Sequence, residues 1–358
     1  MVVVNARGKN GLCQQMNVIT KANRTFIISC CKTILVFVLF HLVIAFLPVI
    51  HGIFWMQLKH FDEKNLLSAN SQETLAQIYQ IYPNLKRTNR TKLNNSENKV
   101  PLPNVSIDPC IVHQVSAKRA VPNKWKKLVA SVKRKSSTTC SYIHWTDKTM
   151  REFIVDHYPW FLQVYDGYWY EIQRVDAFRY FALYHFGGIY LDMDIGLQQN
   201  LDFFTRFQMI LPMTKPIGFS NDFIAAQKHH PFMKYLMDNL AVWNKWYLSP
   251  YFTVMFSTGP MFLSIQYGLA PSNLTKNIFL LDQHLYSGDL YFFKHGIGNS
   301  WHRPDTKIIN LFLFVAGLIF FLLFKTYLPY LVLLVFLLHR HRSTWLNACS
   351  NFYSTLSS

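Results

Sequence analysis

Two aspartates follow a short apolar stretch near the middle of the chain. Asp192 and Asp194 come directly after residues 189–191, and we expect a strand over residues 189–194. In a strand, residues two apart point to the same face of the sheet, so this spacing brings both carboxylates to one place. Two convergent carboxylates suit a hard divalent cation, and such a cation can bridge a diphosphate. The spacing therefore indicates nucleotide-sugar transfer chemistry.

A helix is expected just before this strand, over residues 171–186, and a Gly-Gly pair at residues 187–188 ends it. Arg174, Asp176 and Arg179 interrupt its otherwise apolar sequence. Asp176 and Arg179 are three residues apart, so they can lie on one helical face. Two interpretations stay open. The pair either forms an intrahelical ion pair or belongs to the same site as the two aspartates.

Further strands and helices alternate upstream of this region. The sequence predicts strands over residues 110–114 and 141–145, and a helix that Thr146 or Asp147 caps and that ends before Pro159. Such alternation indicates an α/β domain with a largely parallel sheet. Ligands of these sheets bind beyond the carboxyl ends of the strands, where we expect the two aspartates to lie.

Two apolar blocks flank this domain, which we place at residues 107–305. Residues 34–54 contain no Asp, Glu, Lys or Arg and are long enough to cross a bilayer as a helix. A second membrane segment is expected over residues 308–338, as one span with Lys325 near the interface or, alternatively, as a hairpin. The other interpretation of either block is a buried core helix. The predicted fold class is an α/β domain flanked by two transmembrane helices.

The distribution of charge predicts the orientation of these spans. Residues 1–33 contain basic but no acidic side chains, so the positive-inside rule assigns this tail to the cytosol. Two spans return the tail over residues 339–358 to the cytosol as well. The part in between is then lumenal, with a polar stem over residues 60–105 before the α/β domain. Glycosylation sequons in this part agree, at Asn89, Asn94, Asn104 and Asn273.

Cysteine usage in the lumenal part is sparse. Of the chain's six cysteines, Cys110 and Cys140 are the two that fall there. They form a disulfide or remain as two buried thiols, and the sequence leaves both interpretations open.

The composition favours anionic partners. The chain has 358 residues and a formal net charge of +17. Nucleotide diphosphates and anionic lipid head groups suit such a charge. Neither an RNA-stacking signature nor a zinc-finger spacing is present, so nucleic acid is not an expected partner. Residues 118–135 hold eight Lys or Arg residues. This run is a solvated basic face or, as a sharper hypothesis, a surface that attracts an anionic membrane lipid.

The motifs taken together carry a resemblance to a known family. The Arg-x-Asp-x-x-Arg-Tyr helix, the Gly-Gly turn and the Tyr-Leu-Asp-x-Asp strand resemble the core of glycosyltransferase family 32, and within it the fungal mannosyl-inositol phosphorylceramide synthases. Further motifs between residues 107 and 305 agree with it: Pro109–Gln114, Trp145–Asp147, Ser220–Asp222, His230–Phe232, Ser257–Pro260 and His295–His302.

The resemblance implies a Rossmann-like GT-A fold and a function. The reaction would be a retaining transfer of mannose from GDP-mannose to the inositol of inositol phosphorylceramide, in sphingolipid synthesis. The implied metal is Mn²⁺ or Mg²⁺. The implied residues are Asp194 for the metal, Asp192 for the donor's ribose or a water on the metal, and His302 for the metal or the diphosphate. Asp176 and Arg179 are implied for the donor sugar, His113 and Gln114 for the nucleotide, and Asn221 and Asp222 for the acceptor side.

Other interpretations remain beside this one. An α-mannosyltransferase of the same family could act on N-glycans or glycoproteins, although such enzymes usually carry a single N-terminal anchor. A non-catalytic membrane scaffold could keep the fold without the reaction, and the intact Asp192 and Asp194 argue against it. The resemblance also implies a Golgi membrane location and a separate multi-spanning regulatory subunit.

Overall fold

The structure is a computed structural model. It describes residues 47–56, 66–68, 71–83, 104, 106–117, 120–136, 140–215, 217–287, 291–296 and 298. All of them belong to the first of two compact units, residues 1–299. The two predicted tails, the predicted membrane segment at 308–338, most of the one at 34–54, and His302 lie outside the described residues. Among those that are described, no helix combines the length and apolarity that crossing a membrane requires.

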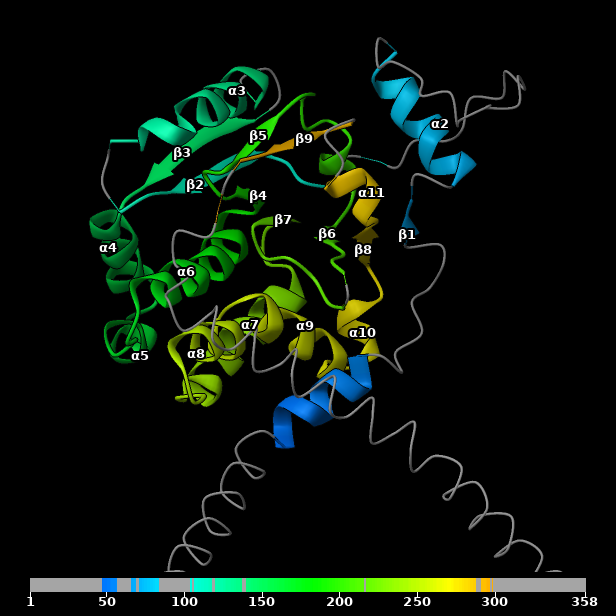
Figure 1. Ribbon diagram of the computed structural model, residues 1–358. Coiled ribbons are helices and arrows are strands. Elements are labelled where there is room, and N and C mark those ends of the chain that lie inside the picture. Colours follow the sequence, from blue (N-terminus) through cyan, green and yellow to red (C-terminus); the bar gives the residue numbers. More distant parts are fainter. Residues whose placement is uncertain are drawn as a thin grey trace, which may run out of the picture. The chain divides into compact units, whose positions relative to one another are not determined.

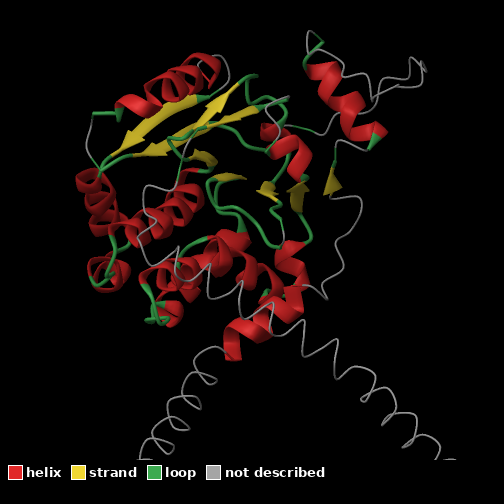
Figure 2. Ribbon diagram, viewed as in Figure 1, coloured by secondary structure: helices red, strands yellow, loops and turns green. Residues whose placement is uncertain are grey.

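A mixed seven-stranded sheet forms the centre of the domain (Figure 2). Its order is β1-β8-β6-β7-β4-β2-β3, and a separate two-stranded sheet pairs β5 with β9. Every neighbouring pair in the large sheet is parallel except the two that involve β7. The largely parallel α/β sheet is therefore confirmed. The strands are β1 Leu66–Leu67, β2 Ile111–Val115, β3 Ser141–Trp145, β4 Gly188–Leu191, β5 Ile195–Leu197, β6 Met209–Pro212, β7 Phe223–Ala226, β8 Ile278–Leu281 and β9 Phe293–His295.

Helices cover both faces of the large sheet (Figures 1 and 2). The α-helices are α2 Gln72–Ile81, α3 Lys126–Ser136, α4 Asp147–His157, α5 Leu162–Asp166, α6 Glu171–Phe186, α7 Pro231–Trp243, α8 Pro250–Ser257, α9 Pro260–Leu269, α10 Ser272–Thr275 and α11 Gln283–Tyr286. Residues 47–56 are helical too. Short 3₁₀ turns are η2 Asn123–Trp125, η3 Pro159–Phe161 and η4 Phe204–Arg206.

Two apolar cores result, one on each face of the sheet. Strand residues alternate between them, as the two-residue period of a strand requires. Tyr190 packs into the core beneath α4, α6, α7 and α9, whereas its neighbours Ile189 and Leu191 pack into the core that includes residues of α2, α3 and α11. Strand β4 is buried on both sides. A strand buried on both sides can hold a polar site only at its end, which is where the aspartates follow.

Local signals explain the helix α6 and the turn after it. The Gln173 side chain accepts a hydrogen bond from the Tyr170 amide at the start of α6. Gly187 and Gly188 end the helix with φ of 69° and 103°. A Cβ at Gly188 would lie 2.1 Å from the Ile111 carbonyl oxygen, so the turn needs glycine for space as well as for its dihedral angles. The predicted helix over residues 171–186 is confirmed.

The segment predicted as a polar stem contributes to the fold. Strand β1 extends the sheet through Leu66 and Leu67, which pair with Leu280 and Leu281 of β8. Helix α2 lies within the predicted stem, and it buries Leu75 and Ile78 in the second core. Composition alone assigned residues 60–105 to a stem, because the apolar positions of α2 are diluted by polar neighbours.

Helix 47–56 packs directly on α9. Val49 joins the core, and Ile53 packs against it. Two glycines permit a close approach of the backbones, because a Cβ at Gly268 would lie 2.6 Å from the Met56 amide nitrogen and 2.8 Å from the Gly52 carbonyl oxygen. Helix 47–56 is therefore fixed to the domain.

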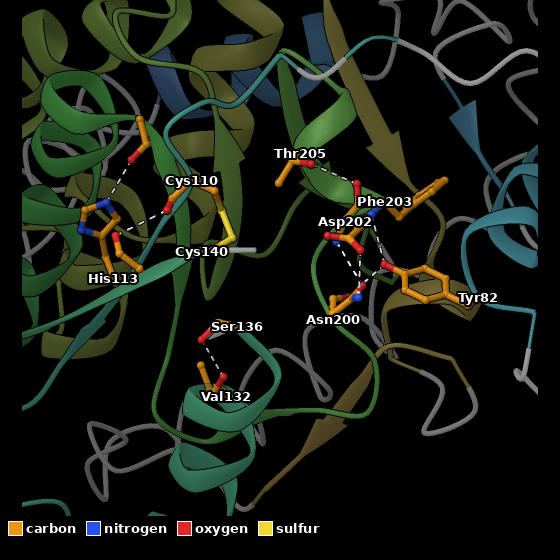
Figure 3. The surroundings of a disulfide bond; sticks show 12 residues. Tyr82, Cys110, His113, Val132, Ser136, Cys140, Asn200, Asp202, Phe203 and Thr205 are labelled. Atoms are coloured by element: carbon orange, nitrogen blue, oxygen red, sulfur yellow. Dashed lines mark hydrogen bonds between the residues drawn. A yellow bond between two sulfur atoms is a disulfide. The ribbon is translucent and has the colours of Figure 1, made fainter. Parts of the chain in front are cut away.

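A disulfide joins the residues just before β2 and β3 (Figure 3). The sequence left this pairing open, and the structure connects Cys110 to Cys140. Their surroundings are the end of α3, where the Cys140 amide donates to the Ser136 carbonyl. The bond closes a loop that contains the whole of α3.

Replacing both cysteines by serine is expected to lower the free energy of unfolding by about 3–4 kcal/mol, since the crosslink spans 30 residues of the unfolded chain. Thermal unfolding of the full chain in detergent measures this. Reductant should lower the Tm of the unmodified protein to that of the Cys110→Ser/Cys140→Ser variant, and leave the variant unchanged. Equal Tm values for both proteins without reductant would contradict the prediction.

Candidate active site at the carboxyl end of strand β4

Asp192 and Asp194 lie in a turn that connects β4 to β5. The expected strand over residues 189–194 is wrong in its second half, because β4 ends at Leu191. The Asp192 amide donates to the Asp222 carbonyl (2.8 Å), and the Ile195 amide closes the turn on the Asp192 carbonyl (3.1 Å). A turn, and not the alternation of a strand, therefore places the two carboxylates.

Two buried side chains, those of Tyr190 and Arg179, hold the Asp192 carboxylate in place. Its Oδ1 accepts a hydrogen bond from the Tyr190 hydroxyl (2.8 Å) and lies 3.5 Å from Nη1 of Arg179. About a third of the side chain is exposed. Burial and the carboxylates of Asp222 and Asp194 raise the pKa of Asp192 to about 7, against the lowering effect of Arg179. The site therefore gathers more negative charge than its own cations balance.

The Asp194 carboxylate lies in the same electrostatic neighbourhood. Burial and Asp222 raise its pKa, whereas His295 and Lys124 lower it. The chain after β9 runs close to it. The Gly296 amide donates to the Asp194 carbonyl (2.7 Å), and a Cβ at Gly298 would lie 2.2 Å from Asp194 Oδ2. Gly296 and Gly298 thus lie close to the second aspartate, and its carboxylate leaves no space for a side chain at position 298.

These carboxylates have the chemistry that a hard divalent cation prefers, and a cation would offset the burial and the charge of Asp222 that raise their pKa values. Among the described residues, however, no group of three or more His, Cys, Asp or Glu side chains is arranged to hold a metal ion. The expected third ligand, His302, lies outside those residues. Two aspartates fit a metal site in part, and its third ligand stays a prediction.

Asp176 and Arg179 form a buried ion pair within α6. Arg179 Nη2 donates to Asp176 Oδ1, which also accepts from the Asn221 side chain (3.0 Å), and Thr258 donates to Oδ2 (3.3 Å). Both charged residues are almost fully buried. The ion pair that the sequence left as one of two interpretations is present. Asn221, which bonds to this ion pair, is however also a residue of the candidate site.

Arg179 connects this pair to the turn. Its Nη1 donates to the Asn221 carbonyl and lies within reach of Asp192, and its guanidinium lies 4.4 Å from the ring centre of Tyr190. Nε is buried without a hydrogen-bond partner in the described part of the chain. Arg179 is thus a cation fixed in place behind the carboxylates. Its role in holding the donor sugar, and that of Asp176, stay predictions.

Asn221 and Asp222 lie beside the aspartates. Asp222 accepts hydrogen bonds from the hydroxyls of Ser220 and Tyr286, and its charge acts on both Asp192 and Asp194. Asn221 bonds to the buried pair. The acceptor-side role assigned to them stays a prediction, and their contacts make both residues part of the framework of the site.

His113 and Gln114, assigned to the nucleotide pocket, both make internal contacts. His113 is fully buried, its Nε2 donates to the Gly187 carbonyl (2.9 Å), and its Nδ1 accepts from the Trp145 indole (3.1 Å). Gln114 donates to the Asp192 carbonyl (3.2 Å) and accepts from the Tyr142 hydroxyl. Their nucleotide contacts stay predictions. These bonds show that Gln114 positions the turn that carries the aspartates, and that His113 holds the end of α6 at Gly187.

The burial of His113 predicts a pH dependence of stability. Burial lowers the pKa of His113 to about 4, so the unfolded chain binds its proton first as the pH falls. This contribution is present in full above pH ~6.5 and decreases between pH ~6.5 and ~4, with a loss of roughly 2 kcal/mol at pH ~5. We expect unfolding at pH ~7.5 and ~5 to show a smaller difference for His113→Gln than for the unmodified protein. The exposed His284→Gln is the control, and an undiminished difference in His113→Gln would contradict this.

Sequence reasoning missed three residues near the aspartates. Lys124 acts on Asp194, Tyr286 bonds to Asp222, and His295 lies opposite Ile195 in the β5–β9 pair. Both ring nitrogens of His295 are buried without a hydrogen-bond partner among the described residues. The His-Gly-Ile-Gly motif was the signal for His295. No sequence motif marks Tyr286, because only the folding of the chain brings α11 close to Asp222.

Comparison with known proteins agrees with this geometry. A family model described as a glycosyltransferase sugar-binding region containing a DXD motif matches residues 122–217, which include the ion pair and both aspartates. The chain is therefore similar to this glycosyltransferase family over residues 122–217. The family match and the mixed α/β sheet together support a GT-A-like fold.

Two curated relatives align with more than half of the chain. Inositol phosphoceramide mannosyltransferase 1 of Schizosaccharomyces pombe is 40% identical over 207 residues, which cover 56% of this chain and 64% of the relative. A mannosyl phosphorylinositol ceramide synthase of Saccharomyces cerevisiae is 37% identical over 223 residues, which cover 58% of this chain and 55% of the relative. The chain thus spans less than two thirds of these relatives. A solved glycosyltransferase structure, PaToxG, aligns with 18% identity and a TM-score of 0.35 over 49% of this chain and 74% of that one.

Proposed function

We propose that this glycosyltransferase moves mannose from GDP-mannose to the inositol of inositol phosphorylceramide, with retention of configuration. The names of the relatives reported above support mannosyl transfer and this acceptor. The observation that carries the proposal is the pair Asp192 and Asp194 at the carboxyl end of β4, with Arg179 fixed behind it.

Each residue of the site would have a role that follows from its charge. A bound Mn²⁺ or Mg²⁺ would act as a Lewis acid on the diphosphate as it leaves. Asp194, whose carboxylate is approached closely by Gly298, would hold the cation directly, and Asp192 would support it. Arg179 is preorganised by Asp176, so it can stabilise negative charge on the leaving group without rearranging. Gln114 and Asp222 would fix the turn that carries both aspartates.

We further propose that the enzyme is a Golgi membrane protein with two spans, a lumenal catalytic domain and both termini in the cytosol. The apolar blocks at residues 34–54 and 308–338 motivate the spans. The Cys110–Cys140 disulfide supports an oxidising, lumenal location for the domain. A multi-spanning regulatory subunit is part of the same proposal.

One experiment separates the candidate functions. Membranes that contain the full chain are incubated with labelled GDP-mannose, Mn²⁺ and either inositol phosphorylceramide or a glycoprotein acceptor. We expect label in the lipid only, and none when Mn²⁺ is withheld. Label in protein only would replace the lipid acceptor with a glycan or glycoprotein. Neither transfer nor hydrolysis of the donor, with the protein folded, would indicate a non-catalytic scaffold.

A further inference from the structure

Large apolar side chains gather at one end of the domain. Helix 47–56, the end of α7 at Val242 and the segment 244–248 after α7 all expose them, and α9, on which helix 47–56 packs, also contacts α7 and α8. Figure 1 shows helix 47–56, drawn in blue, at the same end of the domain as α7, α8 and α9. We call these residues the apolar rim: Leu47, Ile50, Phe54, Trp55, Val242, Trp246 and Leu248.

The segment after α7 exposes two residues of the apolar rim, Trp246 and Leu248. Trp246 is 52% exposed and Leu248 45%, while Tyr247 between them is only 3% exposed. The Tyr247 amide donates to the Thr253 hydroxyl (2.9 Å), and this bond fixes the segment to α8. The exposed side chains of Trp246 and Leu248 therefore extend from a backbone that this hydrogen bond holds in place.

The backbone at Leu248 has a conformation that is costly for leucine. Leu248 has φ of 66°, and the Ser249 amide bonds back to the Tyr247 carbonyl (2.7 Å). This is a three-residue γ-turn with positive φ, a rare and strained form. Glycine would adopt it freely. A leucine kept in a strained turn with nearly half of its surface exposed suggests a binding role for its side chain.

Helix 47–56 supplies the second part of the rim. It continues the apolar block at residues 34–54, and its outer side keeps that character, with Ile50 and Phe54 more than half exposed. The glycine contact with α9 fixes this outer side relative to the rest of the domain. The last residues of the apolar block, 47–54, therefore contribute to the rim.

We propose that the apolar rim docks the domain onto a phospholipid bilayer, with Trp246 and Leu248 inserted at the boundary between the head groups and the acyl chains. Tryptophan favours that level, because it has an apolar ring and a polar N–H, and Lys245 beside it can reach lipid phosphates. The insertion fixes the distance of the active site from the membrane surface. The inference concerns the membrane and goes beyond the proposed reaction, since it does not depend on which sugar or acceptor is used.

A rival surface lies elsewhere on the domain. The basic run over residues 118–135 includes α3, and Figure 1 places α3 at the opposite end of the domain from helix 47–56. Trp125 lies at the start of this run, with the Lys124 ammonium 4.1 Å from its ring centre. The two surfaces cannot both face one flat bilayer, and each contains a tryptophan that can report on it.

Quenching of tryptophan fluorescence by the bilayer tests the proposal. The full chain is reconstituted in nanodiscs of phosphatidylcholine with either brominated or unmodified acyl chains. Bromine quenches only those tryptophans that reach the acyl region. We expect Trp246→Phe to remove part of the quenched emission and Trp125→Phe to remove none. Loss of quenched emission in Trp125→Phe would assign the bilayer to α3 and overturn the proposal. So would quenched emission that neither variant changes.

Leu248→Gly tests the strained turn separately. Glycine relieves the positive φ, so this variant should unfold at the same or a higher temperature than the unmodified protein. At the same time, quenching of Trp246 should fall by about twofold, because the neighbouring anchor is gone. Val155→Gly on α4, another exposed apolar residue, is the control and should leave quenching unchanged. Full quenching in Leu248→Gly would overturn the role of Leu248 in docking.

Discussion

Replacing Asp194 by alanine is expected to lower the transfer rate by at least about a thousandfold, or roughly 4 kcal/mol of transition-state stabilisation. The diphosphate gains charge as it leaves the sugar, and the proposed cation needs this carboxylate. The fold should not need it, since the described contacts of the Asp194 side chain are its own backbone amide and the backbone at Gly298. Product formation in membranes, normalised to the amount of folded protein, measures the effect.

Two controls make this result specific. Asp166→Ala removes a carboxylate that bonds to Arg151 on the surface, so activity should stay within about twofold. Removing divalent ions with EDTA should inactivate the unmodified enzyme, and Mn²⁺ should restore it. Mn²⁺ should not restore Asp194→Ala. An active Asp194→Ala enzyme would sink the assignment of Asp194 to the metal.

The elements nearest the site could be predicted because their signals are local. The helix over residues 171–186 ends at two glycines, and the turn after it requires glycine for both its dihedral angles and its space. Thr146 caps α4, and it is followed three residues later by Thr149, which completes a capping box. Signals of this kind lie within a few residues of the feature that they determine.

The DXD turn itself was predicted incorrectly, for a physical reason. The alternation of a strand suggested that residues 189–194 stay extended. In the structure, Asp192 still bonds to the Asp222 carbonyl, in register with the β4–β7 pair, and the chain turns directly after it, where the Ile195 amide bonds back to the Asp192 carbonyl. The last partner of this segment thus lies just before the antiparallel neighbour β7, and no pattern within the motif reveals it.

Which residues meet at the site could not be predicted from the sequence for the same reason. Asp222 raises the pKa of both aspartates because β7 pairs with β4, and Tyr286 reaches Asp222 from a helix that follows β8. A sequence motif assigned Asp222 to the acceptor side, yet only the sheet order places it beside Asp192. Motifs identify the residues of this site, and long-range pairing determines which of them meet.

Replacing Arg179 by methionine is expected to cost about 3–5 kcal/mol of unfolding free energy, because Asp176 would stay buried without its counter-ion. Transfer should fall by about a hundredfold or more, since Arg179 is also the cation nearest Asp192 among the ion pairs of the described residues. Denaturant unfolding and transfer assays on the same preparation measure both effects. A fully stable Arg179→Met protein would contradict the burial argument.

The double variant Asp176→Asn/Arg179→Met separates structure from catalysis. With both charges removed, the amide side chain introduced in place of Asp176 can still bond to Asn221 and Thr258, so most of the lost stability should return. Activity should not return, because the fixed cation behind Asp192 is still missing. If activity instead recovers together with stability, the ion pair serves only to hold α6 against β7, and the site works through its carboxylates alone.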